Sequence, residues 1–284
     1  MPELPEVETI RRSLLSIIGR RIEAVEVVEP RLRRRVAENF TSQLVGRLIE
    51  GIERRGKYLL FHLSGVLPEE ERANRRPFAG GESLLVHLGM SGALLLQPAG
   101  TSRQLHDHVR IRLSGDVQLM YNDPRRFGLL RAGHTAEFVE LGNVGPDPLA
   151  ETFSAADLAA LVRGRKKPVK NLLMDQRALG GIGNIYANEI LFRAGIRPGR
   201  QARRLTRAEI RRLLGATRAV LRSAIRHGGS SISDYRDGSG RPGYFQLRLR
   251  VYGRAGEPCL RCRTAIRRTV HAGRSSFYCP KCQR

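Results

Sequence analysis

The sequence predicts an α+β protein of more than one domain. An N-terminal antiparallel β-sandwich with a leading helix is expected to precede a helical domain and a short cysteine-containing tail. From residue 22 to about 145, short apolar segments alternate with polar residues and turns, as in strands with one buried face. Beyond residue 148 the apolar residues recur at helical spacing, and all four cysteines lie in the last 26 residues. A chain of 284 residues is long enough for this division.

Residues 7–18 predict an amphipathic helix that packs against a core. Glutamates near its start suit the positive end of the helix dipole, and Gly19 is a typical helix stop. The pattern carries no information on Pro2 and Glu3, which precede it. The apolar stripe consists of Val7, Ile10, Leu14, Ile17 and Ile18.

Seven segments separated by turn residues predict the strands of the sandwich. Between the third and the fourth, residues 65–82 lack periodicity and predict a long exposed loop, to which we assign no function. The seven segments are RIEAVEVVEP, RLIEGIE, YLLFHLSG, ESLLVHLG, ALLLQP, VRIRLSG and VQLMYND.

The pattern changes at residues 145–148, where GPDP predicts a hinge between domains. Farther along, an 18-residue segment rich in Gly and Ser spans 228–245, and a loop of this length is usually functional or disordered. A short strand, LRLRVYG, is expected after it. The expected helices are 155–162, 169–174, 185–194, 207–214 and 217–225. The expected domains are 1–148, 149–235 and 236–284.

The charge of the chain is strongly unbalanced, with 50 Lys and Arg against 27 Asp and Glu and a net charge of +23. Such an excess favours a polyanionic partner, although a solvated basic surface would show the same balance. A basic membrane-surface helix is disfavoured because the chain has no Trp. No stretch approaches the roughly 20 apolar residues that span a bilayer. The N-terminal PELPEVET is acidic, unlike a secretory signal, so a cytoplasmic location is expected.

The four cysteines form two CxxC pairs, Cys259 with Cys262 and Cys279 with Cys282. Four thiolates at this spacing favour one structural Zn²⁺ with no open coordination position, and an iron–sulfur cluster or a redox pair is the alternative. Residues 259–284 hold seven Lys or Arg and no Asp or Glu. This excess of positive charge favours a zinc-bound segment that contacts phosphates over one that only stabilises the C-terminus.

The chain carries the motifs PELPEVETIRRSL, RRGKYLL, HLGMSG, DPRRFG, LMDQ, GIGNIYANEILF, GRPGYF and the terminal RSSFYCPKCQ. Together these motifs, which run from one end of the chain to the other, resemble the formamidopyrimidine-DNA glycosylase family. The opening differs from that of the related endonuclease VIII branch, which usually begins Pro-Glu-Gly-Pro-Glu. The resemblance implies a helix-two-turn-helix domain and a C-terminal zinc-finger β-hairpin. It also implies a base-excision-repair DNA glycosylase and abasic-site lyase for oxidised purines, namely 8-oxoguanine and formamidopyrimidines in duplex DNA.

The resemblance implies that Pro2, freed by removal of Met1, is the nucleophile that forms a Schiff base before β,δ-elimination. An α-amine titrates near 8, so a neutral fraction is present at pH 7. Glu3 would protonate the sugar ring oxygen, with Glu6 as a carboxylate neighbour or only a helix-start residue. Lys57, expected in a hairpin turn, would assist elimination.

The remaining implied residues contact DNA. Met90, Arg125 and Phe127 would fill the gap left by the extruded nucleotide, with Arg125 facing a partner cytosine. From the residues alone, Met90 and Phe127 are typical of core positions. Lys166, Lys170 and Asn184 are expected at the DNA backbone, Asn184 at a phosphate-binding helix start. His87 would contribute either backbone contacts or packing. Arg274 would contact the phosphates that flank the lesion and take part in the second elimination, and Tyr244 lies in the loop that closes over the base.

Two other functions remain open from the sequence. The same fold could process oxidised pyrimidines, or the chain could be a zinc-dependent DNA-binding protein without catalysis. The resemblance further implies a monomer that binds damaged double-stranded DNA, no membrane partner, and association with the nucleoid when DNA is bound.

Overall fold

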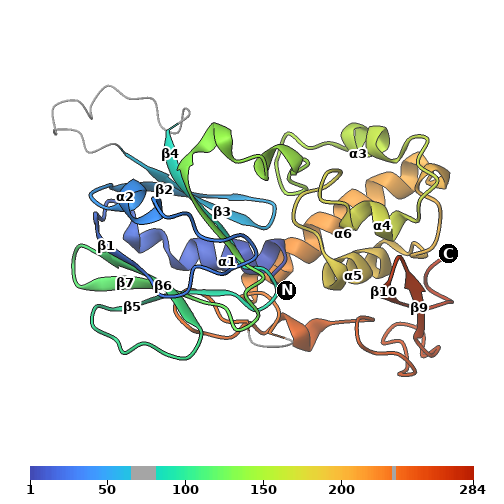
Figure 1. Cartoon of the computed structure of the whole chain (residues 1–284). Helices are drawn as coiled ribbons and strands as arrows, with labels where there is room; N and C mark the ends of the chain where they lie inside the picture. The colour runs from blue at the N-terminus through green and yellow to red at the C-terminus, as the bar shows by residue number, and fades with distance from the viewer. Residues whose placement is uncertain (65–80, 232–234) are drawn as a thin grey trace. The chain divides into compact units, whose positions relative to one another are not determined.

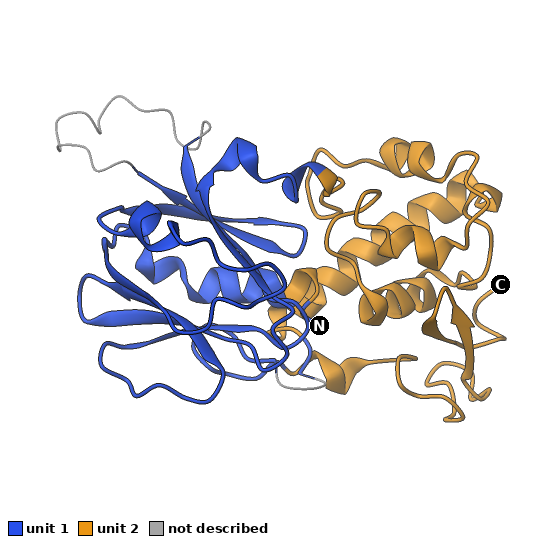
Figure 2. Ribbon diagram, viewed as in Figure 1, with its two compact units in different colours: residues 1–2, 6–142, 230–243 blue, residues 3–5, 143–229, 244–284 orange. Residues whose placement is uncertain are grey.

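The computed structural model of the chain describes residues 1–64, 81–231 and 235–284 (Figure 1). Residues 65–80, nearly all of the predicted 65–82 loop, lie outside the described residues. The chain divides into two compact units, drawn in different colours in Figure 2. Unit 1 comprises residues 1–2, 6–142 and 230–243, and unit 2 comprises residues 3–5, 143–229 and 244–284.

Unit 1 contains the predicted antiparallel sandwich. One four-stranded sheet has the order β1-β6-β7-β5 and the other the order β2-β3-β4-β8, and every pairing is antiparallel. All seven segments predicted as strands form strands, and β8 is an eighth. The strands are β1 (Ile22–Val27), β2 (Ile49–Arg55), β3 (Tyr58–Leu63), β4 (Glu82–His87), β5 (Ala93–Pro98), β6 (Asp107–Leu113), β7 (Val117–Asn122) and β8 (Leu129–His134).

The sandwich core explains the alternation of the strands. Leu59 and Phe61 of β3 join the large apolar cluster that includes both sheets and the leading helix. Leu60, on the opposite face of β3, packs in a smaller cluster with Phe138. Five of the six residues of β3 are therefore buried, which accounts for its continuous apolar sequence.

The leading helix is shorter than predicted. Helix α1 (Leu4–Ser13) begins three residues before the expected start, and a 3₁₀ turn (Leu15–Ile17) replaces its last part. Pro5 is tolerated because the first turn of a helix needs no backbone N–H donor. At the other end, the hydroxyl of Ser13 donates to the carbonyl of Ile10 at 2.8 Å, a local bond that competes with continued helix. The second helix of unit 1 is α2 (Phe40–Leu44).

Unit 2 is mainly helical, as predicted. Its buried cluster draws on every helix of the unit and on Leu4. The two helices expected at 207–214 and 217–225 are one continuous helix, because Gly215 is exposed and the apolar stripe runs on through Thr217 and Val220. The helices are α3 (Ala155–Val162), α4 (Val169–Met174), α5 (Asn184–Ala194) and α6 (Arg207–Arg226).

The strand expected at 247–253 is absent from the described chain. A 3₁₀ turn (Phe245–Arg248) begins the segment. The backbone N–H groups of Arg250, Val251 and Tyr252 donate to the carboxylate of Glu189 at 2.9–3.0 Å. These N–H groups therefore have no part in a sheet. The expected zinc-finger hairpin is present as β9 (Arg267–His271) and β10 (Arg274–Tyr278).

No helix among the described residues is long and apolar enough to span a membrane.

Glu8 of α1 is an electrostatic anchor of unit 1. Its carboxylate accepts hydrogen bonds from Arg11 and Arg12 and lies 3.2 Å from the guanidinium of Arg54. Burial raises the pKa of Glu8, but these arginines outweigh burial and lower the pKa from 4.5 to about 2.

We expect Glu8→Gln to lower the free energy of unfolding by about 1–3 kcal/mol at pH 7, because charge-assisted bonds are lost. The stabilising contribution of Glu8 is fully present above pH 4.5 and is lost as the pH falls toward 2. Urea denaturation at pH 7 and pH 3 should therefore show a smaller difference between variant and parent at pH 3. Glu38→Gln, at an exposed glutamate, is the matched control. An equal loss at both pH values would contradict the assignment.

Candidate active site and nucleic-acid interface

The side chain of Glu3 is held at the N-terminus of α5, within unit 2. Backbone N–H groups donate to its carboxylate from Gly183 at 2.7 Å, Ile185 at 2.9 Å and Tyr186 at 3.4 Å. The first N–H groups of a helix have no partner inside the helix and lie at the positive end of its dipole. Glu3, which is 3% exposed, therefore caps a helix that begins 181 residues later in the chain.

Two glycines make this contact possible. A Cβ on Gly183 would lie 2.4 Å from the carboxyl carbon of Glu3, and a Cβ on Gly181 would lie 2.7 Å from the Cβ of Leu4. Gly181 also has a φ of +96°, which disfavours other residues, and its carbonyl accepts the N–H of Leu4 at 2.9 Å. The PEL motif at residues 2–4 and the GIGN motif at residues 181–184 thus pack directly against each other.

Pro2 is buried directly before Glu3 in the chain, and Met1 is exposed. While Met1 is attached, the nitrogen of Pro2 is part of a peptide bond and has no nucleophilic lone pair. Pro2 can act as an amine only after Met1 is removed.

Lys57 lies in the predicted hairpin turn, between β2 and β3, but it is 7% exposed rather than projecting freely. His87, at the end of β4, lies in its electrostatic range. Burial, together with the positive charge of Lys57, lowers the pKa of His87 to about 4. His87 is therefore neutral at pH 7, and its Nδ1 accepts the N–H of Gly89 at 3.0 Å.

Met90 and Phe127 are exposed on two loops of unit 1, at 41% and 45%, although both residue types suggest core positions. The guanidinium carbon of Arg125 lies 4.9 Å from the centre of the Phe127 ring. The two loops are in close backbone contact, because a Cβ on Gly89 would lie 2.4 Å from the carbonyl carbon of Phe127. The structure thus brings these three predicted residues to one end of the sandwich.

Asp123, which sequence reasoning did not single out, organises both loops. It is fully buried and accepts hydrogen bonds from the hydroxyl of Ser91 at 2.7 Å and from the N–H of Gly128 at 2.8 Å. The N–H of Arg125 also donates to it, at 3.3 Å. Its position at the start of DPRRFG was the available signal, because an acid that precedes a proline turn often accepts the N–H groups of that turn.

The four cysteines form one cluster in unit 2. All are reduced, and their Sγ atoms lie within 4.8 Å of one another. The Sγ atoms of Cys259 and Cys282 are 4.0 Å apart, and those of Cys262 and Cys279 are 3.4 Å apart. Zn–S bonds of about 2.3 Å in a tetrahedron require S···S distances of about 3.8 Å. The donor set and its spacing therefore fit a tetrahedral zinc ion, with each thiolate as a ligand.

Lys170 lies beneath the zinc hairpin rather than at the surface. It is fully buried, and its ammonium donates to the carbonyl of Ser275 at 2.6 Å and to the hydroxyl of Ser276 at 2.9 Å. Burial and the charge of Arg274 lower the pKa of Lys170 to about 8, although Glu3 opposes this shift. Arg274 itself begins β10 and is exposed, as is Lys166 before α4. Lys170 is therefore placed to position the strand that carries Arg274.

Asn188 is a second supporting residue that sequence reasoning missed. Its Oδ1 accepts the N–H of Phe277 in β10 at 2.7 Å, and its Nδ2 donates to the carbonyl of Asn184 at 2.6 Å. The same side chain thus joins the first turn of α5 to the zinc hairpin. Its place one turn after Asn184 in GIGNIYANEILF was the only sequence signal.

Asn184 is the first residue of α5. The neighbouring N–H groups that were expected to bind phosphate instead bind Glu3. Tyr244 is 59% exposed, and its N–H donates to the carbonyl of His227 at 2.9 Å. Residues 232–234 of the predicted 228–245 loop lie outside the described residues.

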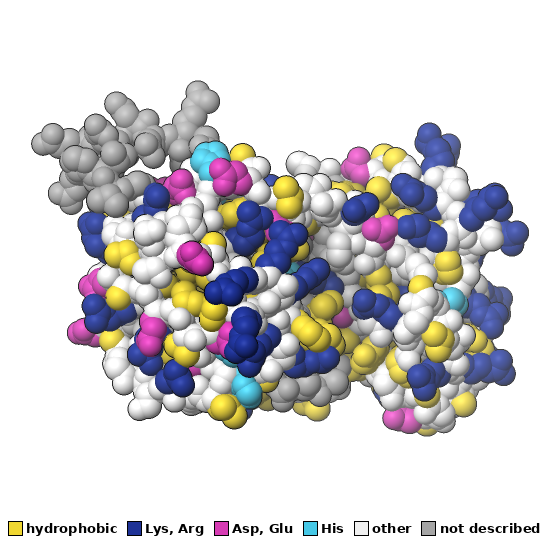
Figure 3. Space-filling view, viewed as in Figure 1, with side chains coloured by type: hydrophobic (Ala, Val, Ile, Leu, Met, Phe, Trp, Pro, Cys, Tyr) yellow, Lys and Arg dark blue, Asp and Glu magenta, His cyan; other side chains and the backbone are white. Residues whose placement is uncertain are grey.

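Basic side chains are frequent on the face of the molecule seen in Figure 3, on both units, and acidic side chains are fewer. This distribution agrees with the charge balance of the whole chain.

Three family models match the chain. The formamidopyrimidine-DNA glycosylase N-terminal domain matches residues 1–130, the formamidopyrimidine-DNA glycosylase H2TH domain matches 144–236, and a zinc finger found in FPG and IleRS matches 256–284. The matched zinc finger and the clustered thiols together show a site for one structural Zn²⁺.

Curated relatives and solved structures agree with these matches. The formamidopyrimidine-DNA glycosylase of Syntrophotalea carbinolica is 47% identical, with both chains covered completely. An FPG variant of Lactococcus lactis in complex with a Fapy-dG-containing DNA is 35% identical, with a TM-score of 0.86 and full coverage of both chains. A MutM in complex with carbocyclic 8-oxo-G-containing DNA is 36% identical, with a TM-score of 0.85 and full coverage of both chains.

We expect Gly183→Ala to displace the carboxylate of Glu3, because the added Cβ has no space. Overpacking of this kind costs about 1–3 kcal/mol of stability, and misplacement of Glu3 should lower strand-nicking activity on damaged duplex at least 10-fold. The matched control is Gly215→Ala in α6, where nothing lies within 4 Å of the new Cβ and helix propensity predicts a gain of about 0.5–1 kcal/mol. Full activity in Gly183→Ala would refute the role of this contact.

Proposed function

Because the chain belongs to the formamidopyrimidine-DNA glycosylase family, we propose that it removes oxidised purines from duplex DNA and cleaves the abasic strand by β,δ-elimination. The observation that carries this proposal is the Glu3 carboxylate, which is fixed by three N–H groups next to Pro2. Relatives at 35% and 36% identity bind DNA with Fapy-dG and with carbocyclic 8-oxo-G. These two lesions support oxidised purines as the substrate class.

Base removal would begin at the secondary amine of Pro2. The amine lone pair forms a bond to C1′ of the damaged nucleotide, and the glycosidic bond breaks with its electrons leaving on the base, which takes up a proton. Glu3 donates a proton to the ring oxygen O4′ as the C1′–O4′ bond opens. The nitrogen, having lost its own proton, then forms a double bond to C1′ and gives a cationic iminium.

Strand cleavage would follow from this electron sink. Loss of a 2′ proton sends its electron pair to the iminium and gives an enamine, whose electrons then expel the 3′ phosphate and restore a conjugated iminium. Loss of the 4′ proton in a second elimination expels the 5′ phosphate. Hydrolysis then releases Pro2. Lys57 is proposed to assist proton transfer in these steps, and Arg274 to neutralise the flanking phosphates.

Three exposed side chains of unit 1 are proposed to contact the DNA strand opposite the lesion and the gap in the base stack. Met90 and Phe127 would replace the stacking lost when the nucleotide leaves the helix, and Arg125 would donate to the orphaned cytosine. Asp123 holds the loops of Met90 and Phe127 in place by hydrogen bonds, so these loops lose less conformational entropy when DNA binds. His87 would help to position this end of the sandwich.

In unit 2, Lys166 and Asn184 are proposed to contact the DNA backbone, and Tyr244 to lie in the loop that closes over the extruded base. Lys170 would act by holding the Arg274 strand. We further infer that the protein works as a monomer in the cytoplasm and associates with the nucleoid through its DNA.

Borohydride trapping tests the nucleophile and the substrate together. On a duplex with one 8-oxoguanine opposite cytosine, we expect a covalent adduct that peptide mass spectrometry assigns to Pro2, in protein shown to lack Met1. Protein with Met1 retained is the matched control and should give no adduct. Absence of an adduct from processed protein, together with an adduct on an oxidised-pyrimidine duplex, would favour the pyrimidine function. Absence on both duplexes would favour a DNA-binding protein without catalysis.

Arg274→Ala should weaken DNA binding and reduce the salt dependence by about one unit in the slope of log K against log salt, because one phosphate contact is lost. Arg211→Ala on α6, at an equally exposed arginine, should leave the slope unchanged. The slopes can be measured by fluorescence polarisation with an abasic-analogue duplex. Identical slopes in all three proteins would exclude Arg274 from the interface.

A further inference from the structure

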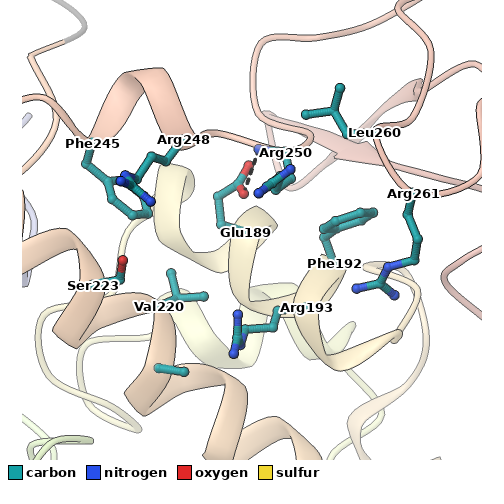
Figure 4. A pocket seen from close by; sticks show the side chains of 11 residues that line it. Glu189, Phe192, Arg193, Val220, Ser223, Phe245, Arg248, Arg250, Leu260 and Arg261 are labelled. Atoms are coloured by element: carbon teal, nitrogen blue, oxygen red, sulfur yellow. Dashed lines mark hydrogen bonds between the residues drawn. The ribbon is translucent and has the colours of Figure 1, made fainter.

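A cavity of about 440 Å³ lies within unit 2, and none of its lining residues is among those proposed to act in catalysis or DNA binding. Figure 4 shows side chains from α5, from α6, from the segment after Tyr244 and from the first zinc knuckle around one hollow. Its size falls within the range of ligand pockets, about 300–1,000 Å³. The lining residues that carry the argument are Phe192, Arg193, Phe245, Arg248, Leu260 and Arg261.

Four arginines but only one carboxylate line this cavity. Arg193, Arg248, Arg250 and Arg261 line it, and no ion pair within 4 Å involves any of the four among the residues that the structure describes. Glu189 is the only carboxylate in the lining, and its oxygens accept the three backbone N–H groups of residues 250–252. Arg250 lies in the electrostatic range of Glu189, whereas Arg193, Arg248 and Arg261 have no carboxylate partner within 4 Å among the described residues.

Apolar side chains line both the interior of the cavity and its opening. Phe192 and Phe245 are buried in its floor, whereas Leu260 at the rim is 50% exposed. An adjoining hollow shares Arg248, Arg250 and Leu260 and adds Tyr244 and Leu247, which are 59% and 81% exposed. Adjacent exposed leucines ringed by cations are typical of a surface that binds a protein segment.

The position and chemistry of the cavity argue against DNA as its occupant. Arg193 is in the last turn of α5, about 15 Å along the helix from the N-terminus that holds Glu3. An unpaired nucleic-acid strand stacks its bases on free aromatic rings, but the two phenylalanines of this cavity, Phe192 and Phe245, are 4% and 5% exposed. The guanidinium of Arg261 also covers the Phe192 ring, at 5.0 Å from its centre.

We propose that this cavity is the docking site for an acidic peptide segment of a partner protein, which inserts one or two apolar side chains beside Leu260 while its carboxylates pair with Arg193, Arg248 and Arg261. Arginine binds carboxylates in a bidentate manner, and an aromatic or aliphatic anchor in a preformed pocket carries most of the affinity in such complexes. None of the residues that line the cavity is proposed to contact DNA, and Tyr244 lines only the adjoining hollow, so a repair complex could hold DNA and the partner together.

The test uses the full zinc-loaded chain and a fluorescein-labelled peptide of Asp and Glu with Phe and Leu at its centre. Fluorescence polarisation should show at least 10-fold tighter binding than for a peptide of equal charge in which Ser replaces Phe and Leu. Arg248→Ser and Leu260→Asn should each weaken binding at least 10-fold. Arg211→Ser and Leu105→Asn, at exposed positions elsewhere, are the matched controls and should bind like the parent.

Two further measurements separate the proposal from its alternatives. Zinc content and nicking of damaged duplex should be unchanged in Arg248→Ser and Leu260→Asn, which would show that the fold and the DNA site are intact. Equal binding of the two peptides would overturn the proposal, because charge alone would then explain it. Loss of duplex affinity in Arg248→Ser, in parallel with loss of peptide binding, would also overturn it and assign the cavity to the DNA surface.

Discussion

The contact between Glu3 and the N-terminus of α5 is the interaction on which the proposed site depends. A buried carboxylate needs hydrogen-bond partners, and the three N–H groups at the start of α5 need acceptors, so each satisfies the other. The contact fixes the register between residue 3 and residues 183–186. It also requires glycine at position 183, because any side chain there would occupy the space of the carboxylate. Because Pro2 is bonded directly to Glu3, this contact also limits where Pro2 can lie.

The same principle recurs at other points of the molecule. The exposed side chains that are proposed to contact DNA lie on loops or strands that buried polar side chains hold in place by hydrogen bonds. Asp123 supports the loops of Met90 and Phe127, and Lys170 supports the strand of Arg274. Such groups persist in the interior because every partner is satisfied, and they order loops that would otherwise lose more entropy on binding. Substitutions beneath the surface are therefore expected to affect DNA contacts without touching DNA.

The helical unit separates two kinds of surface along α5. Its N-terminal end is engaged by Glu3 and lies beside the proposed phosphate contacts, whereas its C-terminal end contributes Arg193 to the arginine-lined cavity. The first zinc knuckle contributes Leu260 to that cavity, and the hairpin between the cysteine pairs carries Arg274. One small zinc-finger element thus contributes to both of the proposed surfaces, which differ in chemistry. This arrangement allows the charge of the chain to have more than one partner.

The sequence by itself determined the sandwich, the helical region and the four-cysteine zinc site, because periodic burial and ligand spacing are local properties of the chain. Local patterns also located α3 and α4 at their observed bounds. The domain boundaries and the roles of the site residues remain predictions. Only the tertiary structure decided which hydrogen-bond acceptor each backbone N–H group or buried ammonium uses. Glu189 prevents a strand at 247–253, Glu3 occupies the helix start that was assigned to phosphate, and Lys170 is directed inward. These contacts join residues about 60 to 180 positions apart, a pairing that no local periodicity encodes.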